Sequence, residues 1–431
     1  MKLLRSALFV FVVVCLLPLA LPAQDAKSTD PKDRQKAAKQ LGERGSSADI
    51  PVLAELVKDP VEDVRAEAVN SIVKIATQHS LPPLIEATRD PVPEIQAMAV
   101  DGMVNFYYPG YVKSGWTGAV KKFTSNLKDR FRRPDPIVID PYVTVDPNVV
   151  QAIARVVVGG TSMDSRANAA RAAGILRDKA ALPQLLEALR SRNTTVILES
   201  VQAIEKIGDR AVGPSMTFLL RDLDEDVQFA VVQAMGQLLV EEAIPDLVDL
   251  AKNSKKKRIR RQSLIALGKM PKPDHRPLFQ QYLSDKDNQM RAAAAEGIGR
   301  LGNEADRQMI VDAFARERSE SPRLSMAFAA VKLGDMTFLP YLLDGLNSTF
   351  HRGESRPFLV ELARQPEVLN RLYEPLIAGT INQKKELAYV ISLSGTRESM
   401  EHLEKLTRDS NADVAQEALR ALKNLQARVS G

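Results

Sequence analysis

The side chains best suited to binding chemistry gather in a segment of about 40 residues between Phe106 and Pro147. This segment holds 8 of the chain's 22 aromatic residues, including the only tryptophan, and its Lys and Arg residues outnumber its Asp residues. Aromatic rings bind apolar surfaces and cations bind anionic ones, so the composition favours a functional binding loop.

Five apolar residues between Trp116 and Phe131 follow one another in this segment at steps of 4, 3, 4 and 4. At about 100° per residue they fall within an arc of about 80°, which predicts an amphipathic helix. Ser114 can cap this helix and Pro134 ends it. The candidate binding residues are the apolar Trp116, Phe123, Leu127 and Phe131 and the basic Lys121, Lys122, Arg130, Arg132 and Arg133.

Three partners suit a helix with an aromatic stripe and a basic opposite face. One is an anionic membrane surface, another is an apolar surface on a second protein, and the third is the chain's own neighbouring helices. The stretch from Pro134 to Pro147 that follows is rich in proline, which favours extended backbone. It is either a strap across neighbouring helices or a plain connector.

A second basic cluster occupies a predicted turn and helix start. Cations at a helix N-terminus oppose the helix dipole, so this placement raises the odds of an anionic ligand such as phosphate, an anionic lipid or an acidic protein. A solvated run of charge remains the preferred interpretation. The candidate anion-binding residues are Lys255, Lys256, Lys257, Arg258, Arg260 and Arg261.

The residue types of catalysis and metal binding do not assemble in this sequence. The four histidines are far apart and lack a second ligand at metal spacing: His79, His275, His351 and His402. Gly297, Gly299 and Gly302 match a dinucleotide pattern but close a helix instead of following a strand. We therefore expect no enzyme activity, no metal, no cofactor and no small-molecule substrate.

These residues are carried by a repeating framework. The first apolar or equivalent position of each copy recurs at spacings of 31, 71, 30, 31, 32 and 31, with weaker copies towards the C-terminus. The 71-residue spacing equals one repeat plus the 40-residue segment. The marker positions are Val64, Ile95, Arg166, Val196, Val227, Ile259 and Met290, then Leu324, Arg356, Leu387 and Val414.

Each copy contains two helical patterns, and the first of them often opens with proline, which is favourable in the first turn of a helix. These prolines are Pro51, Pro82, Pro183, Pro214 and Pro245. A period near 31 residues made of two helices predicts a solenoid, because no single repeat buries its own apolar face. The second patterns, such as Val64, Ala68, Ile72 and Ile75, have helical spacing.

The pattern of Asp or Asn, two residues, Val or Ile, Arg, an Ala-rich helix and a Pro-led helix resembles the HEAT-repeat family. In its short bacterial form it is similar to the phycobilin-lyase type. The resemblance covers most of residues 33–425 and implies an all-α fold, an α-solenoid of about 11 helical hairpins in a right-handed superhelix with one irregular insertion. It also implies a protein-binding scaffold, or less often a chromophore-attaching lyase or isomerase.

The N-terminus predicts a secretory signal peptide at residues 1–23, with basic Lys2 and Arg5 ahead of an apolar run from Ala7 to Leu21. The alternative is an uncleaved membrane anchor. Cleavage removes Cys15, the only cysteine, and lowers the formal charge from +5 to +3. We predict a disordered stretch at 24–32, repeats at 33–106, the insertion at 107–147 and further repeats at 148–431.

Three functions follow as hypotheses. The first is a non-catalytic exported scaffold, periplasmic or extracellular, that binds a protein or peptide on the concave face lined by second helices. The second is a peripheral membrane or cell-surface module that uses Trp116, Phe123 and Phe131. The third is a lyase or isomerase. Export disfavours nucleic acid as a partner.

Overall fold

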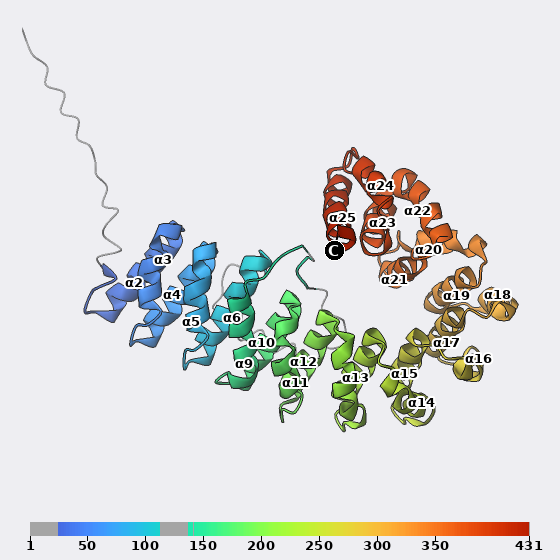
Figure 1. Ribbon diagram of the computed structural model, residues 1–431, viewed down its shortest axis with the longest axis horizontal. Coiled ribbons are helices and arrows are strands. Elements are labelled where there is room, and N and C mark those ends of the chain that lie inside the picture. Colours follow the sequence, from blue (N-terminus) through green and yellow to red (C-terminus); the bar gives the residue numbers. More distant parts are fainter. Residues whose placement is uncertain (1–24, 113–136, 141, 431) are drawn as a thin grey trace, which may run out of the picture. The chain divides into compact units, whose positions relative to one another are not determined.

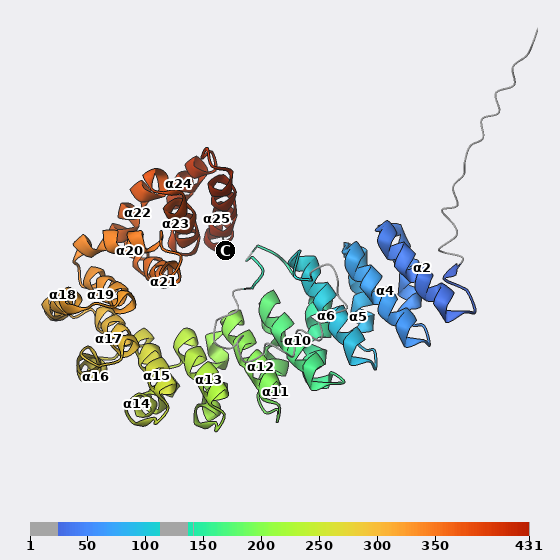
Figure 2. The same cartoon turned by 180° about the vertical axis from the view of Figure 1, so that it is seen from behind.

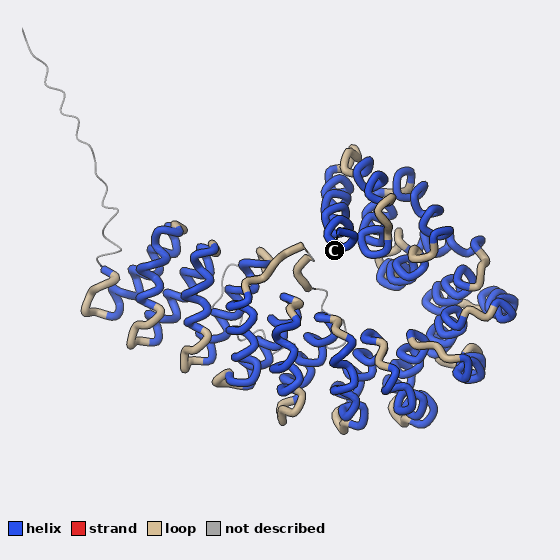
Figure 3. Tube along the Cα trace, in the orientation of Figure 1, coloured by secondary structure: helices blue, strands red, loops and turns tan. Residues whose placement is uncertain are grey.

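Helices make up all the regular secondary structure in the part of the chain that the computed structural model describes, residues 25–112, 137–140 and 142–430 (Figure 3). This confirms the predicted all-α class. The chain divides into two compact units, residues 1–117 (unit 1) and 118–431 (unit 2), and each is described by itself.

Unit 1 stacks three longer helices side by side, with a short helix between successive members. The longer helices are α2 (Pro31–Arg44), α4 (Glu62–Ile75) and α6 (Pro93–Tyr107). The short ones are α3 (Ile50–Leu56) and α5 (Leu81–Ala87), each preceded by a 3-10 turn, η1 (Ser47–Asp49) or η2 (Gln78–Ser80).

Unit 2 repeats this arrangement, with a first helix followed by a second helix that packs on the next second helix along the chain (Figures 1 and 2). The second helices are α10 (Met163–Leu176), α12 (Thr194–Ile207), α13 (Glu225–Leu238), α15 (Lys257–Lys269), α17 (Asn288–Leu301), α19 (Glu320–Lys332), α21 (Arg352–Leu362), α23 (Ile381–Ser394) and α25 (Ala412–Ser430).

The first helices of unit 2 are α9 (Pro147–Gly159), α11 (Leu182–Ala188), η5 (Arg210–Arg221), α14 (Ile244–Asn253), α16 (Arg276–Tyr282), α18 (Arg307–Arg316), α20 (Leu339–Gly345), α22 (Pro366–Ala378) and α24 (Ser399–Leu406). Short 3-10 turns precede several of them: η4 (Lys179–Ala181), η6 (Glu241–Ala243), η7 (Pro273–His275), η8 (Glu304–Asp306) and η9 (Met336–Phe338). The predicted marker of every copy falls within a second helix.

Apolar residues at helical spacing form the core between the two layers. The predicted series Val64, Ala68 and Ile72 of α4 is fully buried, and Val231 and Met235 of α13 are buried in the same way. Burying one such aliphatic side chain contributes about 1.5–3 kcal/mol. A single hairpin buries only one side of its helices, so neighbouring repeats supply the rest of the core.

Four of the five predicted helix-starting prolines lie in the first turn of a first helix: Pro51, Pro82, Pro183 and Pro245. The prediction for Pro214 is wrong, because it lies inside the 12-residue 3-10 helix η5. Gly213 stands just before it, and a Cβ there would lie 2.3 Å from Val240 Cγ2. Glycine and proline together are poor α-helix formers, which explains the different local structure.

Residues 25–32 belong to the stretch that the sequence predicts to be disordered, and the structure describes a defined conformation for them. The Asp30 side chain caps α2 by accepting a hydrogen bond from Lys32 N, so the helix begins at Pro31. Arg34 Nη1 also donates to the carbonyls of Ser28 and Thr29, at 2.9 and 3.1 Å. These bonds to the first turn explain why the segment before the repeats is ordered.

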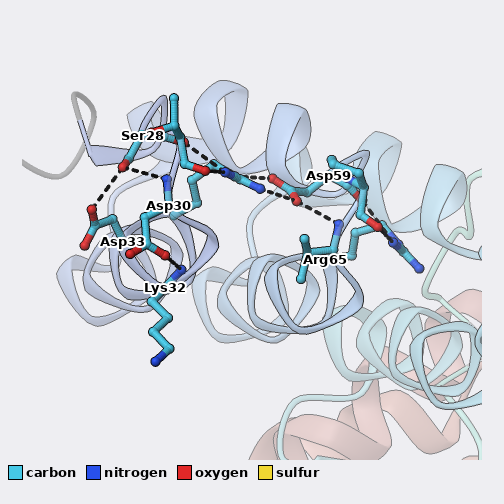
Figure 4. Close-up of polar contacts among 10 residues, drawn as sticks. Ser28, Asp30, Lys32, Asp33, Asp59 and Arg65 are labelled. Atoms are coloured by element: carbon cyan, nitrogen blue, oxygen red, sulfur yellow. Dashed lines mark hydrogen bonds and ion pairs between the residues drawn. The ribbon is translucent and has the colours of Figure 1, made fainter.

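Arginines at the fourth residue of several second helices join successive repeats. In each case Nη1 donates to a carbonyl six residues earlier, and Nε donates to a carboxylate 25 or 26 residues later at 2.6 Å. The pairs are Arg34–Asp59, Arg65–Asp90 and Arg291–Glu317. Figure 4 shows the first two repeats. The Asp59 carboxylate accepts a hydrogen bond from Arg34, and the Asp59 backbone carbonyl accepts one from Arg65.

Candidate functional site

The predicted insertion helix lies outside the described residues. The prediction that it binds a partner through Trp116, Phe123, Leu127 and Phe131, with Lys121, Lys122, Arg130, Arg132 and Arg133, therefore stays a prediction. The structure does describe both flanks, since α6 ends at Tyr107 in unit 1 and α9 begins at Pro147 in unit 2.

The C-terminal flank, the described residues 137–140 and 142–146 (the strap), is bonded to second helices of unit 2. Ile139 N donates to the Ile175 carbonyl of α10 at 3.0 Å, and Lys206 Nζ of α12 donates to the Ile137 carbonyl at 3.3 Å. Ile139 and Val145 are both less than a tenth exposed. These contacts support the strap interpretation over a plain connector.

The strap also reaches the last helix of unit 2. Arg420 of α25 donates through Nη2 to Asp140 Oδ1 at 3.0 Å, across 280 residues of sequence. The hydrogen bond and charge of Asp140 raise the pKa of Arg420. The Tyr142 hydroxyl donates to Asp140 Oδ2 at 3.2 Å. The strap is thus held at α10, α12 and α25 by its backbone and one carboxylate.

The second basic cluster lies where the sequence predicts it, at the turn before α15 and in its first turns. Most of its cations bond within the chain. Arg258 pairs with Asp226 at 2.5 Å, Lys257 and Arg261 pair with Asp287 at 2.8 and 2.7 Å, Arg260 donates to the Ser254 carbonyl at 2.9 Å, and Lys256 donates to the Leu223 carbonyl at 3.4 Å.

Asp287, which caps α17, shows what this cluster does. Burial alone would raise the pKa of Asp287, but the hydrogen bonds from Lys257 and Arg261 lower that pKa below its ordinary range. The cluster therefore joins α15 to its neighbours, which leaves exposed Lys255 as the member without a bonded partner among the described residues. This favours a structural role over an anion site.

A row of polar side chains that the sequence analysis missed lies at one register near the C-terminal ends of successive second helices, and we call this surface the inner face. It consists of the thirteenth residue of five consecutive second helices: Lys206, Gln237, Lys269, Arg300 and Lys332. Four of the five are basic. Aligning the 31-residue copies by column would have revealed this row, whereas a search for local charge runs does not.

Lys269 and Glu205 are the two charges of the inner face that lack an ion-pair partner within 4 Å among the described residues. Lys269 Nζ donates to Gln237 Oε1 at 2.6 Å, and Gln233 Nε2 donates to both Glu205 oxygens at 3.0 and 3.1 Å. Burial lowers the pKa of Lys269, helped by the nearby Arg300 charge, and burial raises the pKa of Glu205.

The next part of the row is compensated by carboxylates. Arg300 bonds Glu361 at 2.9 Å and Glu296 at 3.1 Å, and its side chain is only 12% exposed. Lys332 lies 3.7 Å from Glu361, and the Ser325 hydroxyl donates to Glu296 at 3.1 Å. The inner face thus changes from ion-paired charge at α17 to α21 to the pair Glu205 and Lys269, which bond the neutral amides of Gln233 and Gln237.

In the described part of the chain, no cluster of three His, Cys, Asp or Glu side chains could hold a metal ion. His402 stacks on Tyr373 and His275 packs against Phe279. Gly299 lies in the body of α17 and Gly302 ends that helix, so the dinucleotide pattern is a helix terminus. No helix within the described ranges has the length and hydropathy to span a bilayer.

The sequence matches the family model for HEAT repeats over residues 21–103, 151–236, 214–277 and 244–331, which together are more than half of the chain. No curated protein matches the chain in sequence.

Solved structures with similar folds include an engineered protein, with 17% identity, a TM-score of 0.40, and coverage of 94% of this chain and 98% of that one. The complex of CpcE and CpcF of phycocyanin lyase from Nostoc sp. PCC7120 has 17% identity and a TM-score of 0.36, covering 61% and 94%. Kap121p bound to Ste12p has 11% identity and a TM-score of 0.45, covering 94% and 56%. These identities are too low to carry a function to this chain.

Proposed function

Since this chain belongs to the HEAT-repeat family, we propose that it is an exported, non-catalytic scaffold that binds an extended segment of a protein partner on the inner face of unit 2. The observation that carries the proposal is the strap, an extended piece of the chain's own backbone that bonds to α10 and α12. Export rests on the signal-peptide pattern of residues 1–23.

The contacts of the strap are of a kind that a separate peptide can make. An extended chain leaves its backbone N–H and C=O groups free, and each needs a partner when it is removed from water. Here the Ile175 carbonyl and the Lys206 ammonium supply those partners from successive second helices. The other side chains of the inner-face row lie at the same register of successive helices. They can bond the backbone of a longer peptide in the same way as Lys206 bonds the strap.

The inner face also offers apolar surface further along. Leu393, the thirteenth residue of α23, is 40% exposed, and Tyr389 of the same helix is 38% exposed with the Arg356 guanidinium 4.6 Å from its ring centre. Exposed apolar and aromatic side chains beside satisfied charges are typical of the core of a protein interface. A partner segment thus has polar bonds at α12 to α15 and apolar contacts at α23.

Site-specific photo-cross-linking in the source cells tests the proposal. A benzophenone amino acid at Leu393 should form a discrete cross-linked product, whose partner peptide is identified by mass spectrometry. The matched control places the same amino acid at Phe218, an exposed apolar residue of the first helix η5. Equal products from both positions, or none from Leu393, would show that the inner face is not the binding surface.

A further inference from the structure

The inner-face row places its charges at a regular interval. Lys206, Gln237, Lys269, Arg300 and Lys332 come from helices that pack in succession, and the axes of packed helices lie about 8–10 Å apart. A polyproline II chain rises about 3.1 Å per residue with three residues per turn, so its equivalent side chains recur about every 9 Å. Every third residue of such a peptide therefore meets the next helix of the row.

The charge that lacks a counter-ion on this row is positive. Arg300 and Lys332 have Glu296 and Glu361 as partners, whereas Lys269 bonds only the neutral amide of Gln237. Desolvation of an ammonium without a carboxylate is unfavourable, and an incoming carboxylate relieves it. Glu205 opposes such a ligand, although burial raises its pKa and Gln233 donates to both of its oxygens.

The chain's own strap shows the same ligand chemistry in use. Its extended backbone lies against Lys206, the first cation of the row, and its carboxylate at Asp140 bonds a cation on a second helix, Arg420 of α25. An extended segment is thus already bonded at this end of the row, while its carboxylate bonds a cation outside the row.

We propose that the part of the row from Gln237 to Lys332 binds an extended acidic peptide, one carboxylate of which pairs with Lys269. The inference rests on the proposed function and names the chemistry of the partner. Spanning the four helices α13 to α19 takes about 9 residues of polyproline II chain. The strap then occupies the α10–α12 end of the same surface, next to the bound peptide.

The test measures fluorescence anisotropy of a labelled 15-residue peptide with the repeat Asp-Pro-Ala, titrated with the full chain lacking residues 1–23. Peptides with the repeats Gln-Pro-Ala and Lys-Pro-Ala serve as neutral and basic probes. We expect saturable binding of the acidic peptide only. Lys269→Gln should raise its Kd at least tenfold, and Glu205→Gln should lower it severalfold, because a competing carboxylate is removed.

The matched control is Lys255→Gln, which removes an exposed charge at the opposite end of α15 and should leave Kd unchanged. Thermal unfolding of each variant checks that the fold is retained. Loss of binding in Lys255→Gln but not in Lys269→Gln would overturn the proposal in favour of the basic cluster. Binding of the neutral peptide with equal Kd would overturn it while leaving a peptide scaffold intact. Failure of all three peptides would also overturn it, and the cross-link at Leu393 then decides the scaffold function separately.

Discussion

Between α17 and α19, the side chain of Glu317 is only 5% exposed and is held ionised by the Arg291 guanidinium. The hydrogen bond from Arg291 is the main cause that lowers the pKa of Glu317 to about 2, from an ordinary 4.5, and the backbone N–H groups of Arg318 and Ser319 add to it. A lowered folded-state pKa contributes stability that is fully present above about pH 4.5. That contribution is lost as the pH falls towards about 2.

Arg291→Met should therefore lower the free energy of unfolding at pH 7 by about 1–3 kcal/mol, because the carboxylate stays buried without its cation. The difference from the wild type should shrink between about pH 4.5 and pH 2, where Glu317 takes up a proton in both proteins. Urea denaturation across this pH range measures it. Lys405→Gln is the control, because Lys405 and Glu401 form an exposed pair worth under about 1 kcal/mol. A pH-independent difference would refute the linkage to Glu317.

Residue-level features of the candidate site were only partly predictable from the sequence. The cluster around Lys257 was visible because its charges are adjacent, but adjacency did not reveal that Asp287 neutralises two of them. Lys269 escaped notice for the opposite reason. One polar residue at a given position of each 31-residue copy resembles an ordinary solvated side chain, and only the stacking of helices shows that such residues form one row.

At the scale of helices, close approach between neighbours depends on small residues at one register. A Cβ on Gly236 of α13 would lie 2.8 Å from Ala266 Cα of α15, and a Cβ on Gly299 of α17 would lie 2.6 Å from Ala329 Cα of α19. Both clashes are with backbone, which cannot move aside as a flexible side chain can. These glycines therefore set how near successive second helices lie.

Gly236→Ala should destabilise unit 2 by about 1–3 kcal/mol through overpacking, although alanine is the better helix former by about 1 kcal/mol. Gly159→Ala should have the opposite sign, since no atom lies within 4 Å of a Cβ at that position of α9. Thermal unfolding followed by circular dichroism compares the two variants. If both raised the melting temperature, helix propensity and not close packing would govern these positions.

Helix pairs were predictable from sequence because each carries its own signals, namely a proline start, an apolar face of period 3.6 and a recurrence near 31 residues. The error at Pro214 shows the limit of this approach. The equivalent prolines of two other copies, Pro183 and Pro245, lie in the first turns of α11 and α14. Pro214 lies within the 3-10 helix η5, because glycine replaces the apolar residue that precedes the proline in those copies. The neighbouring glycine therefore determined the backbone conformation at Pro214, and the repeat consensus did not predict it.

At the scale of unit 2 as a whole, a solenoid is held together almost entirely by contacts between neighbouring repeats. The strap is an exception, because it bonds α10 and α12 and also the last helix, 280 residues later. No sequence signal identifies this pairing, since it depends on how small rotations accumulate over many repeats. The contact is polar and partly exposed, with Arg420 53% and Asp140 23% accessible, so it contributes no more than about 1 kcal/mol.

The ion pair between Asp140 and Arg420 can fix the position of the strap against α25 without adding much to the free energy of unfolding. Exchanging the two charges tests these two contributions separately. Spin labels on Thr144→Cys in the strap and Lys423→Cys in α25, in a chain lacking residues 1–23, report the distance between them by pulsed electron resonance. Asp140→Arg or Arg420→Asp alone should broaden the distance distribution, because like charges then face each other, while the midpoint of unfolding changes little. Combining the two substitutions restores opposite charges and should restore the narrow distribution. If either single variant kept the wild-type distribution, the ion pair would not hold the strap to α25. Raising the salt concentration to about 1 M, where the screening length is about 3 Å, should broaden the wild-type distribution in the same way as the single variants.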